Sequence, residues 1–158
     1  MLVPAILYKE QIIKEFQKLY YTEDMLFENG NLSQWCPNLK DAPDEGRFDY
    51  AIVSGDKLIG YLSYQIDYYV SRAYNFGLMS FDRGNPSIGY NLFEKMEELI
   101  SKMHKVEWCC VSGNPVEKHY DNFCEKHHGI KHVLKDSLKD HDGNYRDCII
   151  YEIFNNDK

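Results

Sequence analysis

A strand, a short polar turn and a helix follow one another between Gly77 and Met103, and this unit constrains the fold more than any other stretch. The turn ends in Asn85-Pro86, a strong helix start, because asparagine can cap free amides and proline is tolerated at the first helical position. Such a unit can direct backbone amides and a positive helix end at an anion. On this stretch alone, an ordinary strand-to-helix connection is the simpler interpretation. The apolar residues that recur at helical spacing are Ile88, Leu92, Met96, Leu99, Ile100 and Met103.

Length and composition predict one folded domain over residues 1–158, large enough for a core without disulfide bridges. Hydrophobic residues make up 44% of the chain and aromatic residues 15%, which excludes a disordered protein. The thirteen tyrosines suggest a cavity or a surface lined with amphipathic rings.

Several classes of location and partner are disfavoured by the sequence. No apolar run approaches the roughly 20 residues needed to span a bilayer. The N-terminal stretch MLVPAILYKEQ lacks the charged region and cleavage site of a signal peptide. We therefore expect a cytoplasmic protein with no membrane partner. The net charge of −7 and the lack of a basic stripe disfavour a nucleic-acid partner and better suit a cationic small substrate.

The five cysteines, an odd number in a chain without an export signal, predict free thiols. Cys124 and its neighbouring histidines could suggest zinc, but paired ligand spacing is absent, so we expect no metal site. His119 and His127 are instead interpreted as residues of a solvated helix face.

The N-terminal third reads as helical and then irregular. Residues 5–20 have the spacing of an amphipathic helix, and Thr22 can cap a second short helix that ends near Phe27. Residues 32–47 contain two prolines and read as a loop that Trp35 anchors. This loop is either a lid on the substrate side or a variable surface excursion.

From residue 48 onward the pattern is that of strands joined by two helices. A glycine within the third strand, Gly77, suggests a bulge or a close approach by a ligand. The strand–helix–strand unit over 73–111 needs a right-handed crossover, so two strands should be parallel and bind ligands at their C-terminal ends. Together the elements predict an α/β domain with a mixed central sheet flanked by helices. They are strands over 48–53, 58–68, 73–81 and 106–111, a helix over 116–126 ended by Gly129, and a hairpin over 132–138 and 146–154.

From Phe48 onward, the order of elements and several motifs resemble the GNAT superfamily of N-acetyltransferases. The hairpin YAIVSGDKLIGYLSY looks like the second and third strands of that family, and FDRGNPSIG falls at its acetyl-CoA signature. Asn114 falls at the asparagine that ends the fifth strand, and Tyr120 falls near the frequent catalytic tyrosine. The segments NPVEKHYDNFCEKHHG and KDHDGNYRDCIIYEI look like a branch of uncharacterised bacterial GNAT proteins.

The chain also departs from the family pattern. With Gly89 at the last signature position, Ser87 replaces the central glycine, Gly84 replaces the Gln or Arg, and Arg83 stands one place early. Pro86 removes one N–H from the anion cradle. Tyr120 lies six residues after the asparagine instead of the family's usual seven, a rotation of about 100° on a helix.

The resemblance implies an acetyl-CoA-dependent N-acetyltransferase that acts on an amine of a small molecule or peptide by direct attack in a ternary complex. It implies Tyr120 as the proton donor to the thiolate, and we take Glu107 as the base, with Asp67, Asn75 and Asp82 as alternatives. The alternative function is a catalytically weak protein that binds acyl-CoA or another ligand as a sensor. The C-terminal hairpin and the tyrosines leave room for a homodimer. The expected cofactor-binding residues are Met79, Ser80, Phe81, Arg83, Gly84, Asn85, Ser87, Ile88, Gly89, Tyr90 and Asn114.

Overall fold

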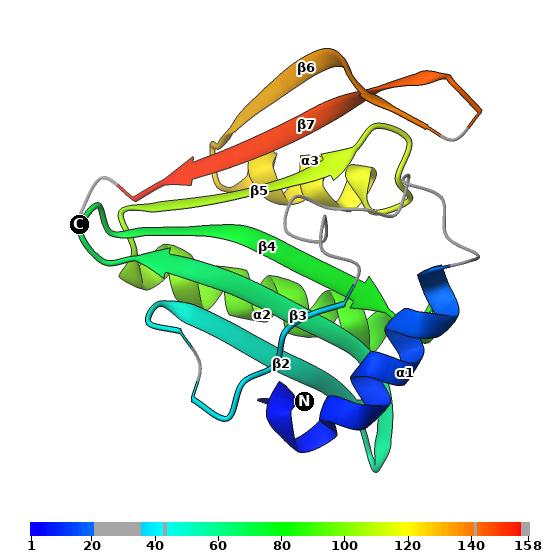
Figure 1. Ribbon diagram of the computed structural model, residues 1–158. Coiled ribbons are helices and arrows are strands. Elements are labelled where there is room, and N and C mark those ends of the chain that lie inside the picture. Colours follow the sequence, from blue (N-terminus) through cyan, green and yellow to red (C-terminus); the bar gives the residue numbers. More distant parts are fainter. Residues whose placement is uncertain (21–35, 43, 141, 156–158) are drawn as a thin grey trace.

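The computed structural model describes residues 1–20, 36–42, 44–140 and 142–155. Its strands form one mixed sheet in the order β1-β2-β3-β4-β5-β7-β6 (Figure 1). This confirms the α/β mixed sheet predicted from the sequence. The elements are β1 (Leu2–Pro4), the 3-10 helix η1 (Ala5–Tyr8), α1 (Lys9–Tyr20), β2 (Arg47–Ser54), β3 (Lys57–Asp67), β4 (Arg72–Ser80), α2 (Pro86–Lys102), β5 (Lys105–Val111), α3 (Glu117–Lys126), β6 (Ile130–Lys139) and β7 (Tyr145–Phe154).

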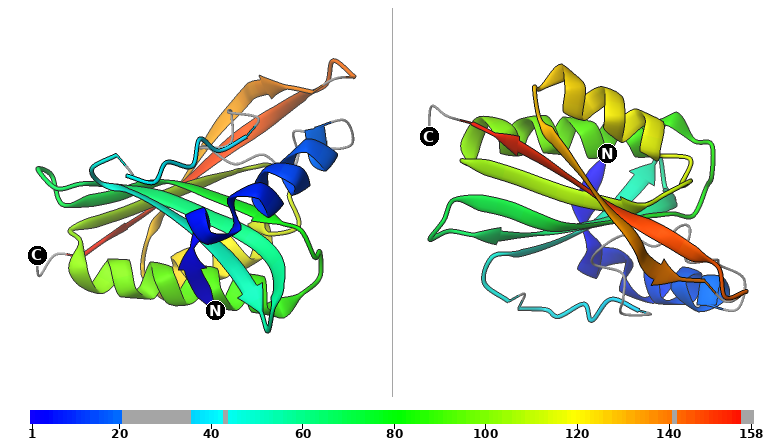
Figure 2. Two further views of the ribbon diagram at one scale, coloured as in Figure 1. Left: turned by 60° about the horizontal axis from the view of Figure 1, so that its bottom comes forward. Right: turned by 90° about the horizontal axis from the view of Figure 1, so that it is seen from above.

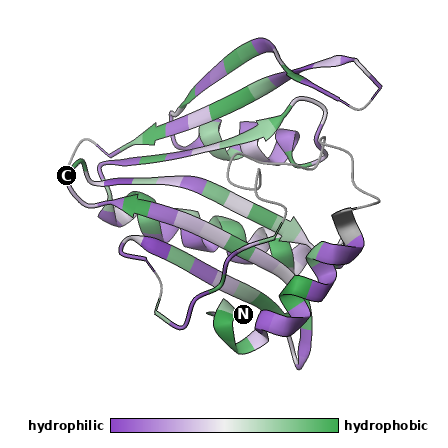
Figure 3. Ribbon diagram, in the orientation of Figure 1, coloured by the Kyte–Doolittle hydropathy of each residue, from purple (hydrophilic) through white to green (hydrophobic). Residues whose placement is uncertain are grey.

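Helices cover both faces of the sheet. α2 and α3 lie against one face and α1 lies against the other (Figure 2). The larger core, between the sheet and α2 and α3, contains Leu62, Met96 and Trp108. The smaller core lies under α1 and contains Ile12, Phe16 and Tyr61. Along α1, hydrophobic and hydrophilic residues are interspersed, as expected for an amphipathic helix (Figure 3).

The start of α2 follows the signals in the sequence. The side chain of Asn85 caps the helix by accepting the Ser87 amide hydrogen at 3.0 Å, and Pro86 occupies the first turn. One face of the helix is buried, because Ile88, Leu92, Met96 and Leu99 recur at helical spacing. The predicted helix and its cap are therefore confirmed.

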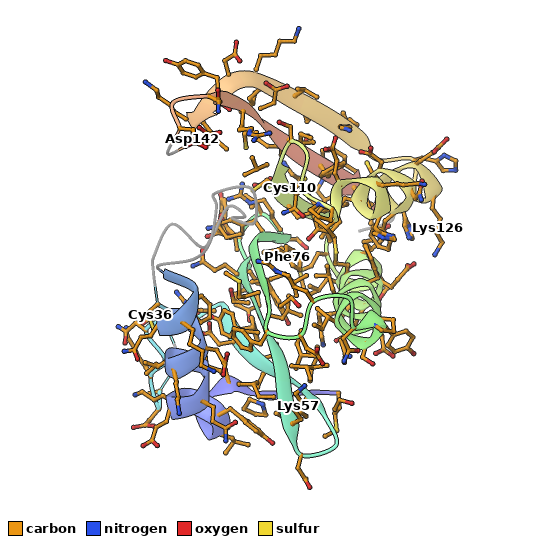
Figure 4. All side chains as sticks on the ribbon, turned by 90° about the vertical axis from the view of Figure 1, so that its right-hand side faces the viewer. Cys36, Lys57, Phe76, Cys110, Lys126 and Asp142 are labelled. Atoms are coloured by element: carbon orange, nitrogen blue, oxygen red, sulfur yellow. The ribbon has the colours of Figure 1, made fainter. Side chains whose placement is uncertain are left out.

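β4 and β5 are parallel neighbours at one end only. Their register pairs Arg72 with Lys105 and Ala73 with Val106, and no later residues of the two strands pair. Figure 1 shows the strands diverging from this joined end toward the side of the molecule that faces the viewer in Figure 4. The predicted parallel pair is confirmed, and its divergence leaves an opening between the C-terminal ends of β4 and β5.

β4 carries a bulge, as the sequence suggested, but not at Gly77. Ser63 pairs with Gly77 and Gln65 pairs with Tyr74, so two residues of β4 face one residue of β3. Asn75 takes the strained conformation, with φ of 52°, which asparagine tolerates better than most residues. A bulge bends its strand and increases the local twist, so this one helps β4 to turn away from β5.

Gly129 ends α3 by close packing and not by a left-handed conformation. His128 has the positive φ, 53°, and the Gly129 amide donates to the Cys124 carbonyl at 2.8 Å. A Cβ atom on Gly129 would lie 2.6 Å from the carbonyl oxygen of Glu152 and 2.7 Å from the sulfur of Cys124. The predicted helix stop is confirmed. The absence of a side chain at Gly129 lets the end of α3 pack closely against β7.

Some sequence expectations need correction. The first three-residue strand was not predicted, and the helix expected over 5–20 begins as η1. His127 is not on a solvated face, because its side chain is only 18% exposed and lies 2.9 Å from a carboxylate oxygen of Glu97. The closing hairpin and the five free thiols are as predicted.

Two expectations from the N-terminal third fall partly outside the described residues. The helix expected from Thr22 and the anchor Trp35 both lie there. In the rest of the predicted loop, residues 36–42 and 44–46 contain no helix or strand. Among the described helices, none is long and apolar enough to cross a membrane.

Candidate active site

A cavity of about 650 Å³ lies at the open end between β4 and β5. One wall comes from the end of β4, the following loop and the first two turns of α2, and the other comes from the loop after β5 and the start of α3. Its size is that of a site for a small molecule or a cofactor. The lining residues are Leu78, Met79, Ser80, Arg83, Gly84, Asn85, Pro86, Ile88, Gly89, Tyr90, Leu92, Phe93, Asn114, Pro115, Val116 and His119.

The charges around this cavity differ from those of the whole chain. The protein has 25 Asp and Glu residues and a net charge of −7, yet no carboxylate is among the described residues that line the cavity. Its basic groups are Arg83 and His119, both exposed at the rim, over an apolar floor that includes Leu92 and Phe93. A ligand with an apolar or neutral arm and an anionic end fits this arrangement.

The hydroxyl of Ser80 is an unused polar group in the cavity wall. Its oxygen is buried, and no group in the described part of the chain hydrogen-bonds it. A buried hydroxyl without a partner costs about 1–3 kcal/mol. A polar group of a ligand in the cavity would remove this cost by bonding Ser80.

The amides at the start of α2 are less available than the sequence suggested. Pro86 has no N–H, the Ser87 amide donates to the Asn85 side chain at 3.0 Å, and the Ile88 amide donates to the Asn85 carbonyl at 3.2 Å. Two glycines leave space beside them, since a Cβ on Gly84 or Gly89 would meet nothing within 4 Å. The helix start is therefore open in shape but largely satisfied in hydrogen bonds.

Most of the residues expected to bind the cofactor meet at this cavity. Two do not. Phe81 packs edge-on against Phe16 under α1, with ring centroids 5.9 Å apart, because neighbouring strand positions face opposite sides of the sheet. Ser87 lines a separate groove beside Met1 and Glu94. The nine expected residues that line the cavity are Met79, Ser80, Arg83, Gly84, Asn85, Ile88, Gly89, Tyr90 and Asn114.

The separate groove is less suited to an anion. It has a volume of about 880 Å³ and lies between the N-terminus, the turn after β2 and α2. Its described lining has mixed charges, with the carboxylates of Glu94 and Glu98 beside Lys95 and the N-terminal Met1. It does not open between β4 and β5.

Comparison with known proteins gives a consistent answer at the level of the fold. No protein-family model matches the sequence, and no curated protein matches it either. Among solved structures, smu.2055 from Streptococcus mutans is similar with a TM-score of 0.65 and 20% identity over 98% of both chains. A protein from Chromobacterium violaceum, described as a probable acetyltransferase of the GNAT family, is similar with a TM-score of 0.63 and 12% identity over 98% of this chain and 85% of that one.

A third structure is the spermidine/spermine N-acetyltransferase SpeG from Vibrio cholerae, with a TM-score of 0.57 and 17% identity over 70% of this chain and 66% of that one. These likenesses agree with the diverging parallel strands and the helix between them. The chain has the GNAT fold. The motifs in the sequence and the three-dimensional arrangement therefore agree on this fold.

In this GNAT fold, Tyr120 does not reach the cavity. Its side chain is 2% exposed and packs against the rings of Phe93, Trp108 and Tyr151. Burial raises the pKa of Tyr120 above its usual value. The residue seven places after Asn114 is Asp121, which accepts a hydrogen bond from Tyr151 at 2.8 Å. The role of Tyr120 as a proton donor stays a prediction, and its position is that of a core residue.

Glu107 lies toward the joined end of β4 and β5 and not at the cavity. Its carboxylate is 2.8 Å from the Lys105 ammonium and 3.7 Å from the Arg72 guanidinium. Val111, at the end of β5, lies four positions after Glu107, a distance of about 13 Å along a strand. The pair between Arg72 and Glu107 joins β4 to β5 where these strands are neighbours, whereas Lys105 and Glu107 both belong to β5. A role for Glu107 as a base stays a prediction.

His119 is a cavity residue that the sequence did not indicate. It is exposed, as predicted, but it lies on the side of α3 that faces the cavity, together with Val116. The signal that could have found it is spacing, because Val116, His119 and the buried Phe123 recur at intervals of three and four residues. Among the described residues, no group of three or more His, Cys, Asp or Glu side chains is arranged to hold a metal ion.

Proposed function

We propose that this protein is an acetyl-CoA-dependent N-acetyltransferase that transfers an acetyl group to a primary amine of a small molecule or peptide. One observation carries the proposal. In a GNAT fold, the cavity between the diverging ends of β4 and β5 has a basic rim, an apolar floor and no carboxylate among its described lining residues.

The residues of the cavity suit coenzyme A, a long neutral arm that ends in phosphates. Leu92 and Phe93 offer apolar surface to the arm, and the buried Ser80 hydroxyl offers it a hydrogen bond. Arg83 and His119 offer positive charge or N–H donors to phosphates at the rim. As a cosubstrate, acetyl-CoA supplies the activated acetyl group.

Acetyl transfer from a thioester to an amine requires few protein groups beyond those that bind and orient the two reactants. The thioester carbonyl must be polarised, the amine must lose a proton, and the departing thiolate must gain one. Holding the two reactants in one site supplies a large part of the rate enhancement by itself. We propose direct attack of the amine in a ternary complex, with no covalent enzyme intermediate.

The acceptor class is proposed on two grounds. The chain is acidic, with a net charge of −7, which favours approach of a cationic amine. One protein of the same fold, SpeG, is a spermidine/spermine N-acetyltransferase. Polyamines are therefore the first acceptors to test, followed by amino acids and peptide N-termini.

A second candidate function is a binding protein that senses acyl-CoA and turns it over slowly or not at all. The observation in its favour is the start of α2, where Asn85 uses the Ser87 and Ile88 amides and Pro86 has none. With fewer free amides, phosphate binding depends on side chains, and catalysis loses a rigid anchor for the cosubstrate.

The two functions separate in an assay of thiol release. Purified protein is incubated with acetyl-CoA and a panel of amines, with spermidine and spermine first, and free coenzyme A is recorded over time. An N-acetyltransferase releases thiol only when the accepted amine is present, and the acetylated amine appears in equal amount. Thermal stabilisation by acetyl-CoA without thiol release on any amine would instead support the sensor. The absence of both effects would overturn both functions.

A further inference from the structure

We propose that Cys109 and Cys148 form a redox-active thiol pair, which a small-molecule disulfide such as glutathione disulfide converts into a disulfide bond between β5 and β7. This site is independent of the proposed function, because neither cysteine is among the described residues that line the cavity. Through it the protein can respond to the balance of thiols and disulfides around it.

The pairing of β5 with β7 brings the two cysteines to one face of the sheet. The register pairs Cys148 with Val111, two positions after Cys109, so the cysteines are diagonal neighbours across adjacent antiparallel strands. The residues that follow them, Cys110 and Ile149, are buried in the core against α2 and α3. Since successive strand residues point to opposite faces, the side chains of Cys109 and Cys148 both lie on the other face.

The two thiols are also in contact with each other. Burial raises the pKa of Cys148, and a hydrogen bond that the Cys109 thiol donates to the Cys148 sulfur opposes this rise. Such a bond favours the thiolate, which is the form that attacks a disulfide. Both residues are half-buried, so a small reagent can reach them while the two strands hold them in place. Cys148 is therefore the attacking residue, and Cys109 is the resolving one.

The exchange proceeds in two steps. The Cys148 thiolate attacks one sulfur of glutathione disulfide, so a mixed disulfide forms and one glutathione thiolate leaves and takes up the proton that Cys148 has lost. Cys109 then loses its proton, and its thiolate attacks the Cys148 sulfur and releases the second glutathione as a thiol. In total the two cysteines lose two electrons, and glutathione disulfide is reduced to two molecules of glutathione.

The resulting bond should open again easily. Diagonal neighbours in an antiparallel pair have Cα atoms about 7–8 Å apart, whereas disulfide-bonded cysteines usually have theirs at roughly 4.4–6.8 Å. The strands must therefore shift slightly to close the bond, and a strained disulfide is more readily reduced. The two strands stay paired from Lys105 and Phe154 to Val111 and Cys148, so the bond can close and open without unfolding.

The other three cysteines lie in different surroundings. Cys110 and Cys124 are buried in the larger core, and burial raises the pKa of Cys110 to about 12. Cys36 packs against the smaller core near α1 and is half-buried like the pair (Figure 4). Cys36 is therefore the matched single thiol for a control.

The test exposes reduced, folded protein to mixtures of glutathione and glutathione disulfide, quenches with acid and maps the thiols by alkylation and peptide mass spectrometry. The proteins are the wild type, Cys109→Ser, Cys148→Ser and the control Cys36→Ser, each checked by thermal unfolding in the reduced form. A second measurement needs only the wild type. It uses phenylarsine oxide, which bridges two adjacent thiols and protects them from alkylation.

We expect the wild type and Cys36→Ser to form the bond between Cys109 and Cys148 and to lose it again in excess glutathione. Cys109→Ser should instead retain one glutathione on Cys148, and Cys148→Ser should form neither product. Phenylarsine oxide should protect both thiols of the pair together. The absence of this bond from the wild type in every mixture would overturn the proposal, as would a bond from either cysteine to Cys36. Phenylarsine oxide that leaves both thiols open to alkylation would overturn it as well.

Discussion

The side-chain oxygen of Asn85 accepts the backbone amide hydrogen of Ser87 at 3.0 Å, and this bond closes the helix start that faces the cavity. The same side chain donates to Asp82 at 3.1 Å. One residue thus stabilises α2 and competes with any anion for an amide. Stability and ligand binding should therefore respond in opposite directions when Asn85 is changed.

We predict that Asn85→Ala lowers the free energy of unfolding by about 1 kcal/mol, the usual cost of losing an N-cap. The Ser87 amide is then free, so coenzyme A should bind the variant several-fold more tightly than the wild type. Asn85→Ser keeps a capping oxygen and is the matched control, with stability and affinity close to wild type. Urea unfolding and calorimetric titration measure the two effects. Weaker binding by Asn85→Ala would show that the cap supports the ligand and does not compete with it.

A second prediction concerns Gly89, whose missing side chain leaves open space at the cavity. Gly89→Ala should stabilise the protein by about 0.5–1 kcal/mol, because alanine is a better helix former and its Cβ meets nothing within 4 Å. Larger residues should fill the cavity, so affinity for coenzyme A should fall progressively from alanine to leucine to phenylalanine. Thermal unfolding with and without ligand measures both trends. If the affinity does not depend on the size of the side chain at position 89, the ligand binds elsewhere.

A third prediction separates packing from catalysis at Tyr120. Its ring is buried among three other rings, so Tyr120→Ala should cost about 3–5 kcal/mol of stability. Tyr120→Phe keeps the ring, and we expect it to fold normally and to keep at least half of the wild-type turnover with any accepted amine. A hundredfold loss of turnover in a stable Tyr120→Phe protein would restore the proton-donor role implied by the family resemblance.

Local signals predicted much of this fold because they act over a few residues. The Asn85-Pro86 start, the apolar spacing of α2 and the turn between β2 and β3 each depend on neighbours in the chain. β1 was not predicted, because it is a three-residue strand that depends on pairing with β2, some fifty residues later in the chain. The parallel pair of β4 and β5 was predictable from the crossover, but the point at which the strands part was not.

The site was harder to predict, for a geometric reason. The family resemblance placed Ser87 and Phe81 among the cofactor-binding residues, yet each side chain points to another surface. A shift of one position turns a strand residue to the opposite face and a helix residue by about 100°. The same rotation buries Tyr120 while the preceding residue, His119, meets the cavity. Which amides are already bonded depends on side-chain conformation, which no spacing rule gives.

A fourth prediction concerns the ion pairs at the joined end of the sheet. Glu152 contacts Lys105 and lies 2.8 Å from a ring nitrogen of His132. The hydrogen bond from Lys105, followed by that from His132, lowers the pKa of Glu152 despite its partial burial. A lowered pKa means that this carboxylate stabilises the fold above the ordinary glutamate pKa of about 4.3, and that the stabilisation is lost as pH falls through the lower folded value.

The measurement for this prediction is urea unfolding of the wild type and Glu152→Gln at pH 7, 5 and 3. We expect the variant to be less stable by about 1 kcal/mol at pH 7 and pH 5. The difference should shrink toward pH 3, because the pH then falls toward the lowered pKa of the wild-type carboxylate. A difference that stays constant over this range would mean that lost packing, and not lost charge, causes it.

The most direct test of the account is thermal unfolding of the wild-type protein with acetyl-CoA, desulfo-coenzyme A and ATP. We expect both coenzyme A compounds to raise the melting temperature, while ATP, which has phosphates but no pantetheine arm, does not. A ligand at 100 times its dissociation constant adds about 2.7 kcal/mol of stability. An equal shift with ATP would mean that the rim binds phosphates alone. No shift at millimolar coenzyme A would contradict the assignment of this cavity to the cosubstrate and, with it, the proposed enzyme.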